Sequence, residues 1–307
     1  MKEKMMFDEF KKAVVEGIRN WLPENFEVAD VQLNVVKKNN DVKLTGLTIQ
    51  GVGQKVTPVI YLENFYEYYK DGMDMDTILR KIAEIRMEND NDNIMKGMQV
   101  LDFSAMKYKL FPRLLSAEWN QDILRKRPHI FIEDLAVTFY IDMGHVEQGT
   151  MSIPVTYQMM ESWGKTEDEL YHVAVDNLSE LNEGTFDSLY QVMRELLKIN
   201  APDEMMDLMI PEDEKVFVLS KKDKVYGASM LLDKQMMKKV IDQIGENFLI
   251  LPSSIHECLI VVPSCGMEPD DYKDMVCSVN ETSVEEEERL SNNVYRYSLK
   301  EGLKFVK

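Results

Sequence analysis

Helical and strand-like segments follow one another along this chain without a regular strand–helix–strand order. Apolar residues recur every three or four positions from Phe7 to Trp21, which predicts an amphipathic helix. From Val31 to Val35 and again from Val42 to Leu44 they alternate with polar residues, which predicts a hairpin. Because parallel sheets need a steady βαβ order, we expect an α+β fold with mixed or antiparallel sheets and packed helices.

Local end signals place several further elements. Thr166 and Glu169 have the spacing of a capping box at the start of a helix. A helix is expected over 233–244, with Gly245 at its C-terminal cap. We also expect helices over 58–71, 76–85, 186–197 and 270–279, and a hairpin over 216–232 that turns at Lys221–Lys224.

Acidic residues are unevenly distributed along the 307 residues. Residues 1–150 contain 20 Lys and Arg against 24 Asp and Glu, whereas residues 151–307 contain 16 against 30. A chain of this length suits one large domain or two closely packed domains. The change in composition predicts a boundary near residue 150, between an N-terminal α+β region at 1–150 and an acidic α+β region at 151–307.

The net charge of −18 restricts the classes of partner. Nucleic-acid affinity depends on cationic contacts to phosphates, so we expect no direct nucleic-acid binding. A basic protein partner would suit such a surface. No segment reaches the apolar length of a membrane span, and the N-terminus lacks the apolar core of a signal peptide. With only three cysteines, the chain is expected in the cytoplasm.

Short motifs for nucleotides, nucleophiles and metals are incomplete in this sequence. Gly164-Lys165-Thr166 ends like a P-loop, but Met159 stands where that motif needs its first glycine. Ser104 and Lys107 have the spacing of a lysine-activated serine without its partner motifs. Each is interpreted as a turn or a solvated helix end, and no cofactor is expected.

The soft metal ligands of the C-terminal region do not form a zinc motif. They are His256, Cys258, Cys265 and Cys277. None of the cysteines has paired Cys-x-x-Cys spacing, and position 260 is isoleucine where a zinc protease needs its second histidine. We expect no metal site and interpret the cysteines as small buried apolar residues.

A polar segment between two strand-like apolar runs, Ser253 to Glu257, is the strongest candidate site. As an enzyme site, His256 would act as a base, Glu257 would orient it, and Ser253 or Ser254 would be the nucleophile or would contact substrate. Alternatively, serine and histidine side chains bond the backbone where two buried strands turn. The structural interpretation is favoured, and no catalytic residue is assigned.

Several strings together resemble a bacterial family of unknown function, the domain-of-unknown-function 5688 family. They are YLENFYEYYKDG, WGKTEDELYHVAVDN, VYGASMLL, ILPSSIHECLIVVP and LSNNVYRY. Leu251 to Glu257 is the most distinctive piece, and the resemblance implies that it is a family hallmark in a bacterial cytoplasmic protein. There is a fainter likeness to the YtpQ-like family, and neither family implies an activity.

Three classes of function therefore remain open. The first is a non-enzymatic protein that binds, and thereby regulates, a protein partner, which the absence of complete catalytic motifs favours. The second is a hydrolase or small-ligand-processing enzyme centred on His256 and Glu257. The third is an acidic inhibitor that mimics DNA, suggested by Glu281 and the run Glu285–Glu288.

Overall fold

A computed structural model describes residues 4–54, 57–88, 102–146, 149–181, 184–197, 215–263 and 267–306. Its contacts divide the chain into two compact units. Unit 1 comprises Met1–Lys38 and Val42–Leu101, and unit 2 comprises Asn39–Asp41 and Asp102–Lys307. This division differs from the compositional boundary near residue 150. Strand β6 (Leu135–Val146) pairs with β7 (Gly149–Pro154), so a boundary at residue 150 would cut a hairpin.

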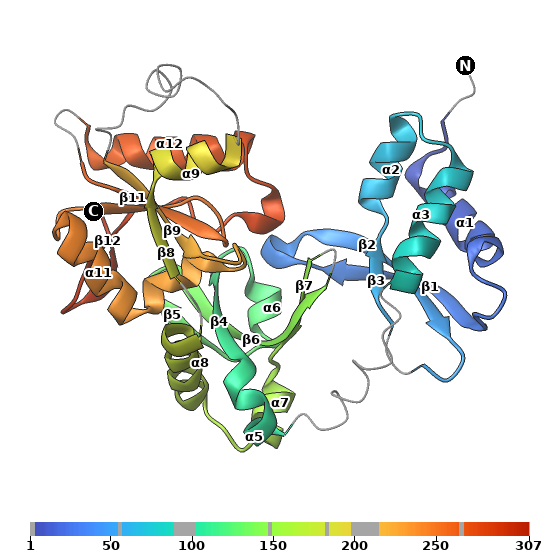
Figure 1. Ribbon diagram of the computed structural model, residues 1–307, viewed down its shortest axis with the longest axis horizontal. Helices are drawn as coiled ribbons and strands as arrows, with labels where there is room; N and C mark the ends of the chain where they lie inside the picture. The colour runs from blue at the N-terminus through green and yellow to red at the C-terminus, as the bar shows by residue number, and fades with distance from the viewer. Residues whose placement is uncertain are drawn as a thin grey trace. The chain divides into compact units, whose positions relative to one another are not determined.

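Unit 1 packs helices against an antiparallel three-stranded sheet in the order β1-β2-β3 (Figure 1). Its elements are α1 (Phe7–Gly17), η1 (Ile18–Trp21), β1 (Val28–Lys37), β2 (Lys43–Gly51), β3 (Val59–Tyr61), α2 (Glu63–Lys70) and α3 (Met75–Glu88). The predicted N-terminal helix and the following hairpin are confirmed. The predicted helix from residue 58 is shorter, because Val59–Tyr61 pairs with β2 as an edge strand before the helix starts at Glu63.

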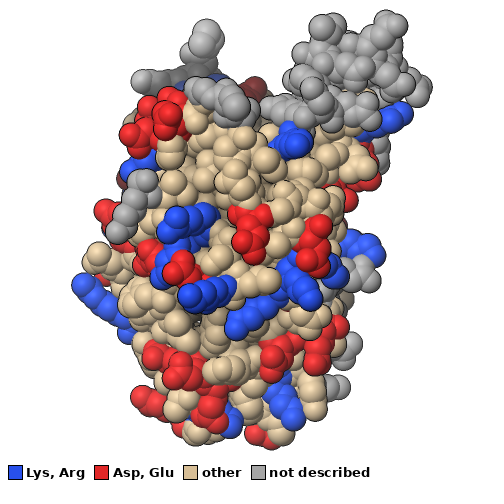
Figure 2. Space-filling model, turned by 90° about the vertical axis from the view of Figure 1, so that its left-hand side faces the viewer, with Lys and Arg blue, Asp and Glu red and all other residues tan. Residues whose placement is uncertain are grey.

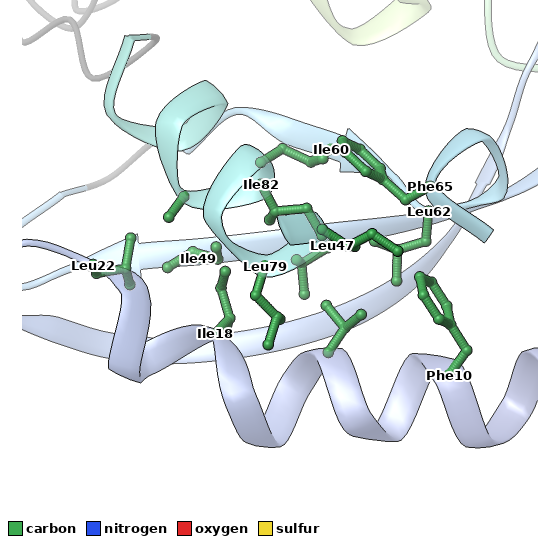
Figure 3. Packing of buried hydrophobic residues seen from close by; sticks show 13 residues of the cluster. Phe10, Ile18, Leu22, Leu47, Ile49, Ile60, Leu62, Phe65, Leu79 and Ile82 are labelled. Carbon is green, nitrogen blue, oxygen red and sulfur yellow. The ribbon is translucent and has the colours of Figure 1, made fainter. Parts of the chain in front are cut away.

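The core of unit 1 lies between α1, α3 and one face of β2. Phe10 and Ile18 point toward Leu47 on β2 and Ile82 on α3, and all four side chains are fully buried (Figure 3). Burying a large aliphatic or aromatic side chain stabilises a fold by about 1.5–3 kcal/mol. The helical spacing that predicted the N-terminal helix thus identifies its core-facing side.

Unit 2 contains two antiparallel sheets with helices packed on them. The first sheet has the order β4-β6-β5, with β7 on β6, and is formed by β4 (Leu110–Ser116), β5 (His129–Ile132), β6 and β7. The second has the order β13-β12-β10-β11-β9-β8, and its strands are β8 (Gly184–Ser188), β9 (Val216–Lys221), β10 (Leu249–Pro252), β11 (Glu257–Val261), β12 (Tyr295–Ser298) and β13 (Gly302–Phe305). The expected α+β fold with antiparallel sheets is confirmed.

The helices of unit 2 include those with clear sequence signals. They are η2 (Asn39–Asp41), α5 (Phe103–Met106), η3 (Lys107–Lys109), α6 (Gln121–Leu124), α7 (Tyr157–Ser162), α8 (Glu167–Leu181), α9 (Leu189–Leu197), η4 (Gly227–Leu232), α11 (Lys234–Ile244), α12 (Pro269–Thr282) and η5 (Glu286–Glu288). The capping box before α8 is present, since the amide of Glu169 donates to the Thr166 hydroxyl at 3.2 Å and the Thr166 amide donates back to the carboxylate of Glu169 at 2.9 Å. Gly245 ends α11 with a positive φ of 84°.

Two predicted elements of unit 2 differ from the structure. Phe186 lies in strand β8 rather than in a helix, and its ring stacks on Phe217 of β9 at 4.9 Å. The expected second strand of the hairpin over 216–232 is instead the buried 3₁₀ helix η4. Both differences have one cause: β9 pairs with β8 on one side and β11 on the other, so it offers no free edge to residues 225–232.

Among the described residues, no helix combines the length and the apolar character needed to cross a membrane.

The core of unit 1 predicts a large difference between two leucines that face each other across β1 and β2. Leu47 is fully buried and Leu33, its direct partner in the register, is 37% exposed. Leu47→Ala should cost about 2–5 kcal/mol of unfolding free energy, because it leaves a cavity in the core. Hydrogen exchange of the unit 1 amides in the full-length protein measures this. Leu33→Ala is the control and should cost less than about 1 kcal/mol; equal costs would contradict the assigned core.

Candidate functional site

The polar segment identified in the sequence is the loop between β10 and β11. The two strands pair directly, with Pro252 opposite Cys258. The amides of Ser253 and Ser254 both donate to the carbonyl of Glu257, at 3.3 and 3.1 Å. The Ile255 amide donates to the Glu288 carbonyl at 2.8 Å, and the His256 amide donates to the Ser254 hydroxyl at 3.0 Å. All four loop amides therefore have partners inside unit 2.

The four candidate side chains separate into two groups. The hydroxyl of Ser253 lies 3.4 Å from the carboxylate of Glu257. The hydroxyl of Ser254 accepts the backbone amide of His256 and makes no hydrogen bond to its ring within the described structure. The loop thus brings a serine and a glutamate together, while the imidazole has other neighbours.

The ring of His256 is held by Tyr226 and Glu288. Its Nδ1 accepts the backbone amide of Tyr226 at 3.1 Å, and the two rings stack with centroids 5.6 Å apart and planes at 13°. With Nδ1 as the acceptor, the neutral ring carries its proton on Nε2, which lies 3.6 Å from the Glu288 carboxylate. Burial lowers the pKa of His256 from its ordinary value, against the opposing effect of Glu288. The histidine is thereby held as a neutral, half-buried side chain.

Tyr226 is in place because the chain turns sharply after β9. Lys224 and Tyr226 both adopt the left-handed conformation, with φ of 60° and 53°, which is unusual for residues other than glycine. The following Gly227 lies so close to the loop that a Cβ on it would be 2.3 Å from the His256 carbonyl oxygen and 2.4 Å from the Ser220 hydroxyl. That hydroxyl also donates to the His256 carbonyl, at 2.8 Å. Only glycine fits between the two segments.

Sequence reasoning did not find Tyr226 or Glu288 as neighbours of His256. Tyr226 lies in the string VYGASMLL and Glu288 lies in the acidic run, and neither string contains a direct signal for a histidine contact. The available signal was the Tyr-Gly pair after a strand, because a glycine inside an apolar run often marks close backbone approach. The partners themselves come from separate segments and need the fold to meet.

The candidate metal ligands that the structure describes do not form a metal site either. Cys258 is a fully buried free thiol on β11, and burial raises its pKa. Cys277 is a second free thiol, on α12, whose sulfur lies 3.9 Å from the Asn292 carbonyl. Cys265 lies outside the described residues. Within those residues, no cluster of three His, Cys, Asp or Glu side chains is suited to a metal ion.

The incomplete motifs are part of local structure. Gly164 has φ of 62° in the turn between α7 and α8, and Lys165 pairs with Glu169 at 2.8 Å. Ser104, in α5, bonds the Asp102 carboxylate, and the Lys107 ammonium lies over the Tyr108 ring. Lys165 of the Gly-Lys-Thr triplet is thus paired with a carboxylate, and Lys107 lies over an aromatic ring instead of contacting Ser104.

A different feature of unit 2 is an apolar groove of about 500 Å³ on the second sheet. Leu251, Leu259 and Val261 form its floor, and α12 contributes Tyr272 and Met275. The alternation in β11 explains the groove, because Cys258 and Ile260 face the core while Leu259 and Val261 face the half-covered side. Figure 1 shows α9 and α12 on the same side of this sheet. The groove can accept apolar side chains of a ligand.

The close approach at Gly227 predicts a specific loss of stability. Gly227→Ala should cost about 3 kcal/mol or prevent folding of unit 2, because the new methyl group meets backbone and the Ser220 hydroxyl. Gly184→Ala is the matched control: its methyl group meets the flexible end of Met230, and the cost should stay below about 1.5 kcal/mol. Urea unfolding followed by tryptophan fluorescence compares them, and a similar cost for both would refute the assigned contact.

The lowered pKa of His256 predicts a pH-dependent stability. The unfolded chain binds a proton near the ordinary value of 6.5 and the folded chain only at lower pH. Unfolding free energy should therefore fall as the pH drops below about 6.5. His256→Asn, which keeps an acceptor for the Tyr226 amide, should flatten this fall in urea unfolding at several pH values. His172→Asn, on the exposed face of α8, should leave the wild-type profile unchanged; an unaltered profile in His256→Asn would contradict the assignment.

Comparison with known proteins identifies the family of this chain. A family model described as a family of unknown function, DUF5688, matches residues 7–299. Comparison with curated proteins and with solved structures gives no match. The likeness to the YtpQ-like family stays an expectation. Because the matched residues span both units and include the β10–β11 loop, the chain belongs to the DUF5688 family.

Proposed function

We propose that this protein is a non-enzymatic bacterial cytoplasmic protein that binds, and thereby regulates, a protein partner. The observation that carries the proposal is the apolar groove on the second sheet of unit 2. Its floor includes Leu259 and Val261, which are only half-buried, and Met267 and Met275 lie at its border. Methionine side chains are flexible and common at adaptable binding surfaces.

The partner is proposed to present a basic amphipathic helix. On α12 the buried residues Tyr272 and Val276 adjoin Met275 and Val279, which are 46% and 40% exposed. The apolar band of the helix is therefore wider than the part that packs on the sheet, which suits a partner helix laid into the groove. Carboxylates stand at the start of the same helix: Glu268, Asp270 and Asp271, with Asp274 one turn on. They favour lysine or arginine on that partner.

The two alternative functions receive less support. A hydrolase with His256 as base and Ser253 or Ser254 as nucleophile needs the serine hydroxyl at the ring. Among the described residues, the ring instead contacts the Tyr226 amide, the Tyr226 ring and Glu288, and the two serine hydroxyls bond other groups. A DNA mimic needs a row of carboxylates with few cations between them. On the face seen in Figure 2, Asp and Glu are interspersed with Lys and Arg. Glu288 of the acidic run is engaged with the β10–β11 loop.

A synthetic helical peptide with leucine on one face and lysine on the other tests the proposal. It should bind the full-length protein, as measured by fluorescence anisotropy, and a scrambled peptide of the same composition should bind at least about tenfold more weakly. Binding should weaken as salt increases, because charge contributes to it.

Substitutions in α12 locate the binding. Met275→Gln keeps the size of the side chain and removes its apolar end, so it should raise Kd of the peptide about tenfold. Leu181→Gln, at the end of α8 and outside the groove lining, changes a side chain that is 56% exposed, and as the control it should change Kd less than about threefold. His256→Asn should leave binding unchanged. Equal binding of both peptides, or full binding by Met275→Gln, would refute the groove as the site.

A further inference from the structure

Two arginines of unit 2 lie beside the first sheet, and neither lines the apolar groove. Arg113 lies on β4, and the register places it opposite Thr138 of β6, which is in turn opposite His129 of β5. Arg127 precedes His129 by two positions, and its carbonyl lies 2.9 Å from the His129 ring nitrogen. Side chains of directly opposed residues share a face of a sheet, so Arg113 shares a face with His129, and Arg127 lies two positions before that strand begins.

The electrostatic surroundings agree with this proximity. Burial, and after it the neighbouring charge of Arg113, lower the pKa of Arg127 to about 10. Burial also lowers the pKa of Arg113. Like charges held together in a half-buried place destabilise each other unless an opposite charge joins them.

Neither guanidinium has an acidic partner within the described part of unit 2. The Nε of Arg113 is buried and makes no hydrogen bond there. Arg125, in the same loop as Arg127, pairs with Asp122 at 3.1 Å, whereas no such pair involves Arg113 or Arg127. Glu287 acts on Arg113 only at longer range. The chain has 54 acidic and 36 basic residues. Because acidic residues outnumber basic ones, two arginines without a carboxylate partner are unexpected.

Aromatic contacts stabilise only part of this arrangement. The guanidinium carbon of Arg113 lies 4.3 Å from the centroid of the Tyr226 ring, a cation–π contact that stabilises by about 0.5–2 kcal/mol. Tyr140 meets the same ring edge-on, with centroids 5.0 Å apart. Burial raises the pKa of Tyr140, so it remains a neutral phenol that can donate a hydrogen bond. The Nε of Arg113 thus has no hydrogen-bond partner although aromatic rings surround the guanidinium.

We propose that Arg113 and Arg127, with Tyr140 and Tyr226 beside them, form a binding site for the phosphate group of a small molecule. Two guanidiniums match the two charges of a phosphate monoester, and their planar donor forks suit its oxygens. The aromatic ring of Tyr226 already packs on Arg113, His256 and Tyr140. Recognition therefore rests on the phosphate group rather than on a stacked base.

The proposed phosphate site is connected to the β10–β11 loop through a shared neighbour, although the loop itself does not contact the ligand. Tyr226 is the shared element, since its ring contacts Arg113 and its amide bonds the His256 ring. Because of this connection, His256 acts as a positioning residue for Tyr226. This inference stands apart from peptide binding in the groove, and each can fail without the other.

Inorganic phosphate is the probe for the full-length protein. Isothermal titration should give saturable binding of phosphate at constant ionic strength, and phosphate should raise Tm while chloride does not. Arg127→Gln should raise Kd at least about tenfold, since it removes charge-assisted hydrogen bonds. Arg125→Gln is the matched control, two positions away with its side chain 74% exposed, and should bind as the wild type does. Arg113→Lys keeps the charge and should still weaken binding, because it lacks the fork.

Two further measurements decide the proposal. Glu287→Gln should lower Kd a few-fold, because it removes a negative charge that acts on Arg113. A sugar phosphate should bind at least as tightly as inorganic phosphate. Absence of phosphate binding by the folded wild-type protein, or an equal loss in Arg125→Gln and Arg127→Gln, would overturn the site. Binding confined to a phosphoserine peptide would overturn the assignment to a small molecule.

Discussion

The close packing of the Gly227 backbone against the His256 carbonyl is the contact on which the organisation of unit 2 depends. It lets the chain leave β9, which is paired on both edges, and pass directly beneath the β10–β11 loop. The left-handed residues Lys224 and Tyr226 make the turn. Such conformations cost energy and persist only where surrounding contacts hold them. Here the holding contacts are hydrogen bonds from Ser220 and Tyr226 to His256.

This turn also gives the half-buried polar string between β10 and β11 a structural role. The serine and histidine groups bond the amides of the loop and of Tyr226, so few polar groups are left unpaired. Ile255 is buried within the same loop. Changing one residue of this set would leave a buried polar group without its partner, which costs about 1–3 kcal/mol.

Charge is used in two different ways in unit 2. At the start of α12, carboxylates lie close to the apolar groove, and we propose that they attract a basic partner. Around Tyr226, two arginines have no acidic partner in the described structure and suit an anionic ligand. The net charge of −18 describes the surface as a whole and gives no sign of the second feature. An anion-binding site and a cation-binding surface can occur in one unit. Within a protein, the electrostatic interaction with a few neighbouring groups is stronger than the interaction with distant charges, which solvent and salt screen.

Much of the fold could be predicted where the signal is local. The helix from Phe7, the hairpin of β1 and β2, the capping box at Thr166 and the glycine cap at Gly245 all follow from residues close together in the sequence. Short strands were missed for the opposite reason. Val59–Tyr61 and Gly184–Ser188 extend runs that look helical, and their pairing with β2 and β9 overrides that preference.

The sequence by itself determined that the chain forms an α+β protein, with mixed or antiparallel sheets left open, an acidic C-terminal half and a distinctive polar string between two strand-like apolar runs. Only the tertiary structure decided what surrounds that string. Arg113, Tyr226, His256 and Glu288 come from four separate segments, and no periodicity or spacing relates them. Their meeting depends on strand pairing and side-chain packing between residues far apart in the chain, which is information that a single sequence carries only through its fold.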